Sequence, residues 1–415
     1  MPKNTVGVMV GLWYGERTIE LEFPGDWEVT RRGMGGEDFA PLTGEQMRVA
    51  LNQPIGTPPL SELGRGKKSA VILFDDLARP TPTSVLAPLV LEELRRVGIE
   101  GDYIRFVAAL GNHRTLARDD IVKKLGPDIV RNYNVYNHNP YENLVEVGKT
   151  SRGTPVIVNR EVMGAELKIA IGCILPHFTA GFGGGAKLFL PGVSGIDSVT
   201  HNHKLARQHA DLMGLGRVND NPMRLDAEEA ARIAGLDFIV NVVVNHRKEP
   251  LGLFAGDVVG AHRQGVALAK RAYGTETPQD RDIVVVSAYP VEVTPQKGLW
   301  AAGASLREGG DVVLILGGPL GRIPHYLMGR FGTDYGGRLW KPTRELAVPG
   351  ARRLLLMGDV ISKNDRDALG PADRVLCFRN WPEVMAELGS DHGPGTRVEV
   401  YPYGSLQCPL FPEEW

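Results

Sequence analysis

Residues 68–80 read KSAVILFDDLARP, and this stretch decides the fold class. The apolar run from Ala70 to Phe74 is short and continuous, as in a strand of a parallel sheet that is covered on both faces. A polar loop with two prolines follows it, and residues 83–97 are expected to form a helix. Strand, polar loop and helix in this order make half of a βαβ unit. The sequence therefore predicts an α/β protein with mainly parallel sheets.

The same order returns twice further along the chain. Residues 103–114 (YIRFVAALGNHR) predict a strand, a polar strand end and then a helix near 117–125, and residues 167–187 (LKIAIGCILPHFTAGFGGGAK) predict a strand that leads into a glycine-rich loop. In open α/β sheets, ligands bind outside the carboxyl ends of the strands. We therefore expect one crevice to collect five side chains: Asp76, Arg79, His113, His177 and Lys187.

The remaining patterns predict two α/β domains, with the active site in the crevice between them. An N-terminal catalytic and cofactor-binding domain is expected over residues 1–275, and a smaller C-terminal domain over 280–399, with a Pro278-containing linker between them. The tail, about 400–415, is expected to pack back on the first domain. Expected helices include 196–209, 226–235, 259–273 and 297–308, and expected strands include 5–14, 17–23, 236–245, 282–287, 311–316, 352–357, 374–378 and 397–401.

Composition excludes several classes of protein. A formal charge of -2 over 415 residues gives no reason to expect nucleic acid or a membrane surface as a partner. Cys173, Cys377 and Cys408 are widely spaced and predict no disulfide framework. The sequence shows neither a signal peptide nor an apolar run long enough to span a membrane, so a cytoplasmic protein is expected.

The glycine-rich loop is a candidate ligand site. Gly183, Gly184 and Gly185 remove side chains, so a ligand can approach the backbone and amides can converge on an anion, with Lys187 above it. The spacing is neither that of a phosphate loop nor Gly-x-Gly-x-x-Gly. A tight turn with a solvated lysine is the alternative interpretation.

Histidines at two strand ends suggest proton transfer, because imidazole titrates near neutral pH. His113 and His177 could act on opposite faces of one substrate, although loop histidines paired with backbone are also common. His203 is a possible metal ligand, but His201 and His209 do not share its helix face, and a surface histidine is the alternative.

Charged side chains after the strand at residues 70–74 suggest a site that binds a ligand. The Arg79 guanidinium suits bidentate binding of a carboxylate, unless it forms a surface ion pair with Asp75 or Asp76. Asp76 could orient a histidine or bind a ribose hydroxyl, and a solvated turn aspartate is the alternative.

Taken together, these segments resemble the lactate racemase family of 2-hydroxyacid racemases and epimerases, which use a nickel-pincer nucleotide. The resemblance rests on several short motifs and extends over residues 65–275: DLARP at 76–80, GNHR at 111–114, the stretch 176–192, His203, Asn221-Pro222, DFIVNVVVN at 237–245 and FAGD at 254–257.

The resemblance implies a role for each candidate residue. Lys187 matches the lysine that tethers the cofactor, pyridinium-3,5-bisthiocarboxylic acid mononucleotide with nickel, and His203 matches the imidazole that completes nickel coordination. His113 and His177 match the two acid/base histidines. Arg79 matches a substrate-site arginine, while Asp76 matches an acidic residue of the same site and is assigned, with Gly183, Gly184 and Gly185, to cofactor binding.

The implied reaction inverts C2 of a 2-hydroxy acid. One histidine takes the hydroxyl proton while the C2 hydride moves reversibly to the cofactor, and the 2-keto acid receives the hydride back on its other face. The hard redox step belongs to the cofactor, and the protein supplies orientation and electrostatics. Loading of the cofactor implies separate biosynthetic enzymes as partners.

The second domain departs from the family pattern. The family has a glutamine and a lysine separated by two residues that reach the substrate, whereas here Gln296 and Lys297 are adjacent. This difference suggests a substrate larger than lactate, such as a sugar acid or an aromatic or dicarboxylic hydroxy acid. Glu292 near the pocket would disfavour a second carboxylate and could accept hydrogen bonds from extra hydroxyls.

Two other classes of protein remain open from the residues. A zinc-dependent hydrolase would use His113, His177 and His203 as ligands. A non-catalytic nucleotide-binding protein would use the glycine loop and Lys187 to hold a phosphate.

Overall fold

A computed structural model describes residues 3–319, 321 and 345–411 and divides the chain into two compact units. Unit 1 contains the described residues of 1–37, 272–323 and 338–412. Unit 2 is described over residues 38–271. Each unit is an α/β structure with its own six-stranded sheet.

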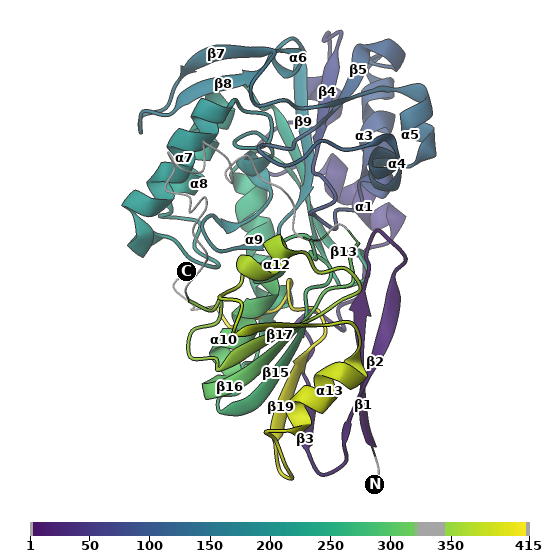
Figure 1. Cartoon of the computed structure of the whole chain (residues 1–415). Helices are drawn as coiled ribbons and strands as arrows, with labels where there is room; N and C mark the ends of the chain where they lie inside the picture. Colours follow the sequence, from purple (N-terminus) through teal and green to yellow (C-terminus); the bar gives the residue numbers. More distant parts are fainter. Residues whose placement is uncertain (1–2, 320, 322–344, 412–415) are drawn as a thin grey trace. The chain divides into compact units, whose positions relative to one another are not determined.

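The sheet of unit 2 has the strand order β13-β12-β9-β4-β5-β6 (Figure 1). Five neighbouring strands run parallel, and β13 at the edge is antiparallel to β12. Their bounds are β4 Ala70–Phe74, β5 Ile104–Ala108, β6 Asn134–Asn137, β9 Leu167–Cys173, β12 Phe238–Val244 and β13 Pro250–Gly256. Every residue of β4, β9 and β12 is buried, as the continuous apolar runs predict.

Helices cover both faces of this sheet. Val71 and Leu73 of β4 belong to a core cluster that also includes residues of α7 and α8, while α3, α4 and α5 lie on the other side (Figure 1). The helices are α1 Gly44–Asn52, α2 Leu60–Leu63, α3 Thr83–Arg96, α4 Arg118–Leu125, α5 Pro127–Asn132, α6 Arg160–Met163, α7 Ile196–Gln208, α8 Pro222–Ile233 and α9 Gly260–Tyr273. Short strands and turns complete the unit: β7 Leu144–Lys149, β8 Pro155–Asn159, β10 Pro176–His177, β11 Gly181–Phe182, η1 Gly101–Tyr103, η2 Gly185–Leu188 and η3 Ala210–Leu212.

Unit 1 contains an all-parallel sheet of order β18-β17-β16-β15-β19-β3. Its strands are β3 Glu28–Arg31, β15 Arg281–Ser287, β16 Leu306–Ile315, β17 Arg353–Met357, β18 Val375–Phe378 and β19 Arg397–Tyr401. The other elements are the hairpin β1 Lys3–Val10 and β2 Arg17–Pro24, the pair β14 Gly274–Thr275 and β20 Cys408–Pro409, and the helical segments η4 Pro295–Leu299, α10 Trp300–Ser305, α12 Lys363–Asp367 and α13 Trp381–Gly389.

The α/β class and the mainly parallel sheets are confirmed, but the division of the chain differs from the expected one. Residues 1–37 group with the C-terminal part of the chain because β3 pairs with β19 and the β1–β2 hairpin packs in the same core cluster. The tail was expected to pack back on the domain of residues 1–275. In the structure β20 pairs with β14 at the end of that range, but both strands belong to unit 1. Residues 412–415 of that tail lie outside the described residues.

One expected helix ends early. Residues 297–308 form a 3₁₀ turn and the short helix α10, and Leu306 already begins β16 by pairing with Arg281. Among the described residues, no helix combines the length and the apolar character needed to cross a bilayer.

Candidate active site

The loop after β4 carries Asp76 and Arg79, and a buried lysine binds its backbone. The Nζ atom of Lys124, on α4, donates to the carbonyl oxygens of Asp76 at 3.1 Å and of Arg79 at 2.9 Å. The same ammonium forms an ion pair with Asp75 at 2.6 Å, and the lysine is 1% exposed. Lys124 therefore fixes the backbone at both candidate site residues.

Asp76 and His113 form a close pair at the ends of two neighbouring strands. Asp76 Oδ2 lies 2.6 Å from His113 Nδ1. Burial alone would raise the pKa of Asp76, but His113, Arg79 and Lys124 hold this pKa below its ordinary value, so the carboxyl is ionised. An ionised carboxylate only accepts, so His113 Nδ1 carries a proton and donates it to Asp76. In the neutral ring of His113, the proton is therefore on Nδ1 and not on Nε2.

His177 has the opposite arrangement. It lies in β10, and its Nδ1 accepts hydrogen bonds from the backbone N–H groups of Thr179 at 3.3 Å and Ala180 at 3.2 Å, with the Thr179 hydroxyl at 3.1 Å. Because a nitrogen that accepts from two N–H groups has no proton, the neutral ring of His177 carries its proton on Nε2. In the neutral state, the two rings are therefore opposite tautomers, with the proton of His113 on Nδ1 and that of His177 on Nε2.

The glycine-rich loop brings Lys187 to the end of β9. Gly184 and Gly185 have φ values of 71° and 57°, and a Cβ at Gly185 would lie 2.9 Å from the ring of His262. Glycine is needed here for close packing of the loop on the protein. Lys187 follows in η2 and is half-buried, and burial, together with the charges of Arg224 and Arg79, lowers the pKa of its amine well below the ordinary value.

His203 lies on α7, with its ring fixed by the helix backbone. Its Nδ1 lies 2.8 Å from the carbonyl oxygen of Val199, one turn earlier, and this carbonyl can only accept, so Nδ1–H is the donor. Burial, the charge of Lys187 and the charge of His113 lower the pKa of His203 to about 3. A neutral imidazole whose Nδ1 is tied to a carbonyl is the usual form of a metal ligand at Nε2.

The structure therefore links five of the predicted residues. Asp76 contacts His113 directly, and the charges of Arg79, Lys187 and His113 act on the pKa values of their neighbours in this group, including that of His203. His177 belongs to the same loop as Lys187, ten residues earlier.

The hydrogen bonds of the glycine-rich loop differ from those expected of an anion-binding site. The amide of Gly183 donates to the carbonyl of Leu175 at 2.6 Å, and that of Gly185 donates to Asn241 Oδ1 at 2.6 Å. These two amides are thus paired within the protein. A role of Gly183, Gly184 and Gly185 in cofactor binding stays a prediction, and packing of the loop already requires two of the three glycines.

The other predicted residues belong to unit 1. Gln296 and Lys297 lie in η4 of unit 1, where Lys297 is 7% exposed, and their contact with a substrate stays a prediction. Glu292 is also buried in unit 1, and its carboxylate accepts from the backbone N–H groups of Gly11 at 3.0 Å and Gly317 at 2.9 Å. It therefore holds the unit's own backbone, which leaves the expected contact with substrate hydroxyls without support.

The zinc alternative required three histidines in one group. Within the described ranges, no group of three or more His, Cys, Asp or Glu side chains is arranged to hold a metal ion, although His113, His177 and His203 are all described. These histidines therefore do not form a protein-only zinc site of the kind that hydrolases use.

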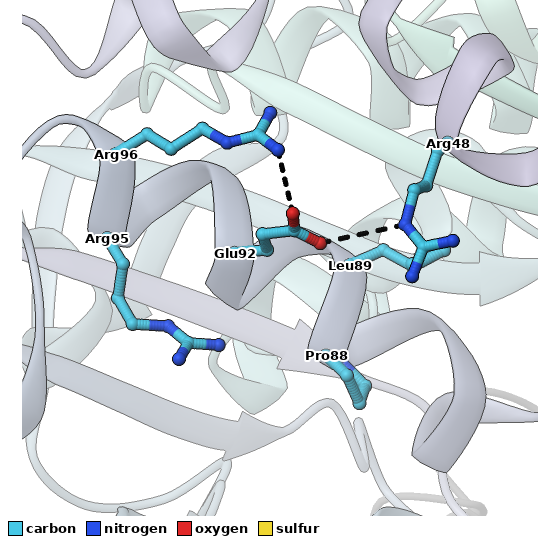
Figure 2. A pocket seen from close by; sticks show the side chains of 6 residues that line it. All are labelled: Arg48, Pro88, Leu89, Glu92, Arg95 and Arg96. Carbon is cyan, nitrogen blue, oxygen red and sulfur yellow. Dashed lines mark hydrogen bonds and ion pairs between the residues drawn. The ribbon is translucent and has the colours of Figure 1, made fainter. Parts of the chain in front are cut away.

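A surface pocket of about 610 Å³ lies elsewhere in unit 2. Figure 2 shows Glu92 of α3 between Arg96 and Arg48, at 2.7 and 3.7 Å. The rest of its wall is Pro88, Leu89 and Arg95. Because the Glu92 carboxylate is paired with arginines and the lining contains no histidine, cysteine or lysine, we do not assign the chemistry to this pocket.

Several buried polar residues behind the loops were missed from sequence. They are Lys124, Arg224, Asn241 and His262. For Arg224 a signal exists, because it lies on the same helical stripe as the buried alanines Ala227 and Ala231, where a charge is unusual. Lys124 follows the exposed Lys123 in an ordinary charged run and gives no such signal.

A parallel α/β sheet that carries an aspartate–histidine pair, a lysine of lowered pKa and a neutral histidine tied at Nδ1 has an arrangement typical of an enzyme site. A model described as the lactate racemase N-terminal domain matches residues 14–214. A lactate racemase from Lactiplantibacillus plantarum is 33% identical over 319 residues, which cover 75% of each chain. Another, from Thermoanaerobacterium thermosaccharolyticum, is 30% identical over 310 residues, which cover 72% of each chain.

Solved structures agree on the fold. The lactate racemase apoprotein from T. thermosaccharolyticum superposes with a TM-score of 0.72 over 97% of this chain and 99% of that chain, at 23% identity. A protein from Thermotoga maritima gives a TM-score of 0.65 over 88% of this chain and 97% of its own, at 19% identity. The chain belongs to the lactate racemase family, and it is accordingly a racemase, an isomerase.

Proposed function

We propose that the chain inverts C2 of a 2-hydroxy acid with His113 and His177 as the two acid/base groups. The observation that carries this proposal is the opposite hydrogen bonding of the two rings. His113 donates from Nδ1 to Asp76, and His177 accepts at Nδ1 from the backbone at Thr179 and Ala180. One ring can take a proton at Nε2 while the other presents one, as inversion of a carbinol centre requires.

Arg79 supplies the substrate anchor in this scheme. A guanidinium binds a carboxylate through two parallel hydrogen bonds, which orients C2 of the acid as well as holding it. Because Lys124 fixes the carbonyl of Arg79 and that of Asp76, the substrate anchor and the support of His113 are held by one side chain.

The nickel-pincer nucleotide fits the donor set of this chain. Lys187 offers an amine whose pKa lies well below the ordinary value, which favours the neutral form that attachment to an acyl group requires, and His203 offers a neutral imidazole with Nδ1 tied to Val199. Asn112 and Asn241 each add a buried amide nitrogen that has no hydrogen-bond partner among the described residues. Lys187 would hold the cofactor covalently, and His203 would ligate its nickel.

When bound, this cofactor supplies a hydride acceptor for the hydrogen at C2. The remaining work falls to the protein: Arg79 orients the substrate carboxylate, and the histidine on the hydroxyl side takes its proton at Nε2. The imidazolium that forms at His113 is stabilised by the ionised Asp76, and the other histidine donates from Nε2 the proton that the substrate oxygen regains. The cofactor's biosynthetic enzymes are the implied partners.

A chiral panel tests this function. Protein coexpressed with the biosynthetic enzymes, its loading verified by mass, is incubated with single enantiomers of lactate and of an aromatic and a dicarboxylic 2-hydroxy acid, and with a sugar acid. Chiral chromatography should show at least one acid converted to its mirror form or its C2 epimer. Loaded protein that leaves every acid of the panel unchanged would overturn the proposal for these substrate classes.

A further inference from the structure

The loop that joins His177 to Lys187 is held through its backbone carbonyls by one buried arginine. Arg224, near the start of α8, donates from Nη1 to the carbonyl of Gly184 at 3.1 Å and from Nη2 to the carbonyl of Phe182, with longer contacts of 3.4 Å to the carbonyl of Ala180. A guanidinium has five N–H donors in a rigid plane, which no other side chain offers. Alternate peptide groups of the loop therefore point at the same side chain.

Arg224 is completely buried, and the only described acidic charge that acts on it, that of Glu228, does so without a direct ion pair. Its exposed fraction is 0%, and among the described residues no carboxylate forms an ion pair with it. Glu228, one turn further along α8, pairs with Arg263 at 2.7 Å instead. Burying a charge is costly unless it is well hydrogen-bonded, and the described hydrogen bonds of the guanidinium all go to carbonyls of this loop. The loop and the arginine thus depend on each other.

Helix α8 also binds the segments that precede and follow this loop in the chain. Asn221, the N-cap of α8, donates to the carbonyl of Thr179 at 2.6 Å, next to the residues that bind the His177 ring. Asp226, two residues after Arg224, accepts from Asn202 Nδ2 at 2.8 Å on α7, beside His203. The first turns of α8 therefore contact the elements that carry His177, Lys187 and His203.

We propose that Arg224 is a positioning residue, which holds the carbonyls of Ala180, Phe182 and Gly184 and thereby aligns Lys187 and His177 with the rest of the site. The inference deepens the proposed function and rests on it, because the roles of Lys187 and His177 come from that proposal. The alignment itself is a property of the protein without cofactor and can be measured there.

The test compares Arg224→Met and Arg224→Lys with Arg232→Met, an exposed arginine of the same helix that receives the same substitution. Hydrogen–deuterium exchange of the cofactor-free full chain reports the amides of Gly183, Gly185 and Lys187, which are hydrogen-bonded in the wild type. We expect at least about tenfold faster exchange at these amides in both Arg224 variants, with β4 and β5 unchanged. Arg232→Met should match the wild type throughout.

The loaded protein gives the second readout. Arg224→Lys keeps the charge but loses the planar fork, so kcat should fall about tenfold or more while KM changes less, because the loop carries reacting groups and Arg79 carries the substrate. Unchanged exchange and kcat in Arg224→Lys would overturn the positioning role even if Arg224→Met fails to fold. If exchange rises as expected but wild-type protein inverts no acid, the positioning role stands and the proposed function fails.

Discussion

Asp76 Oδ2 lies 2.6 Å from His113 Nδ1, so the carboxylate determines which nitrogen of the imidazole carries the proton. The two residues come from different strand ends, 37 positions apart, and the parallel pairing of β4 with β5 brings them together. The proposed acid/base chemistry of the site depends on this pair.

Replacing Asp76 by Asn should lower the rate of inversion by about 100- to 10,000-fold, because an amide can present its NH₂ group to His113 and move the ring proton to Nε2. Initial rates on the loaded protein measure the loss, and ¹⁵N shifts of His113 in cofactor-free protein should show the change of tautomer. A rate close to that of the wild type at equal cofactor content would contradict the role given to Asp76.

The two histidines should be needed together. His113→Ala and His177→Ala are each expected to lose at least about 100-fold in turnover, since each removes one of the two proton-transfer groups. The mass of the loaded protein should stay unchanged in both, because neither residue is assigned to attachment. If either variant kept near-normal turnover, the two-histidine scheme would not hold for this chain.

The lowered pKa of Lys187 predicts a specific pH dependence. A folded-state pKa below the ordinary value of about 10.4 means that the neutral, nucleophilic amine persists at pH values where an exposed lysine is charged. Acylation of cofactor-free protein by a small reagent, followed by peptide mass spectrometry, should give a midpoint for Lys187 at lower pH than for the exposed Lys68. Arg224→Met should move the Lys187 midpoint upward, because it removes a positive charge. Equal midpoints for Lys187 and Lys68 would argue against the burial of the amine.

Lys124 should contribute to stability through its ion pair with Asp75 and to activity through its hydrogen bonds to the loop carbonyls. Lys124→Met leaves the Asp75 carboxylate without its 2.6 Å ion pair and should lower the free energy of unfolding by about 3–5 kcal/mol. Lys123→Met, its exposed neighbour, serves as control.

A second substitution separates the two effects. In Lys124→Met/Asp75→Asn the uncompensated charge is gone, so urea unfolding should show part of the stability restored. The rate should stay low, since the carbonyls of Asp76 and Arg79 still lack their donor. Recovery of rate and stability together would show that Lys124 acts only through folding.

Local sequence was sufficient for the strands and for the residues that follow them. The runs that became β4, β9 and β12 are buried throughout, and β5 is buried except at Arg105. The polar residues that follow β4, β5 and β9 include Asp76, His113 and His177. Parallel pairing then places these residues at one edge of the sheet, which is a consequence of the fold class alone.

What the sequence did not reveal depends on pairing between distant segments. Strand β3 lies at 28–31 and joins β19 at 397–401, and no local pattern near Glu28 indicates a partner that far along the chain. Leu306, expected in a helix, begins a strand because β15 provides a pairing edge. The side chains that hold the site loops, Arg224 and Lys124, are buried by tertiary contacts that neighbouring residues do not specify.

The most direct test of the central claim is the intact mass and metal content of the protein after coexpression with the nickel-pincer biosynthetic enzymes, with Lys187→Arg prepared in parallel. The account predicts an added mass that maps to Lys187 and bound nickel in the wild type, and no added mass in Lys187→Arg. Unmodified wild-type protein without nickel, obtained under conditions that load a known lactate racemase, would contradict the account.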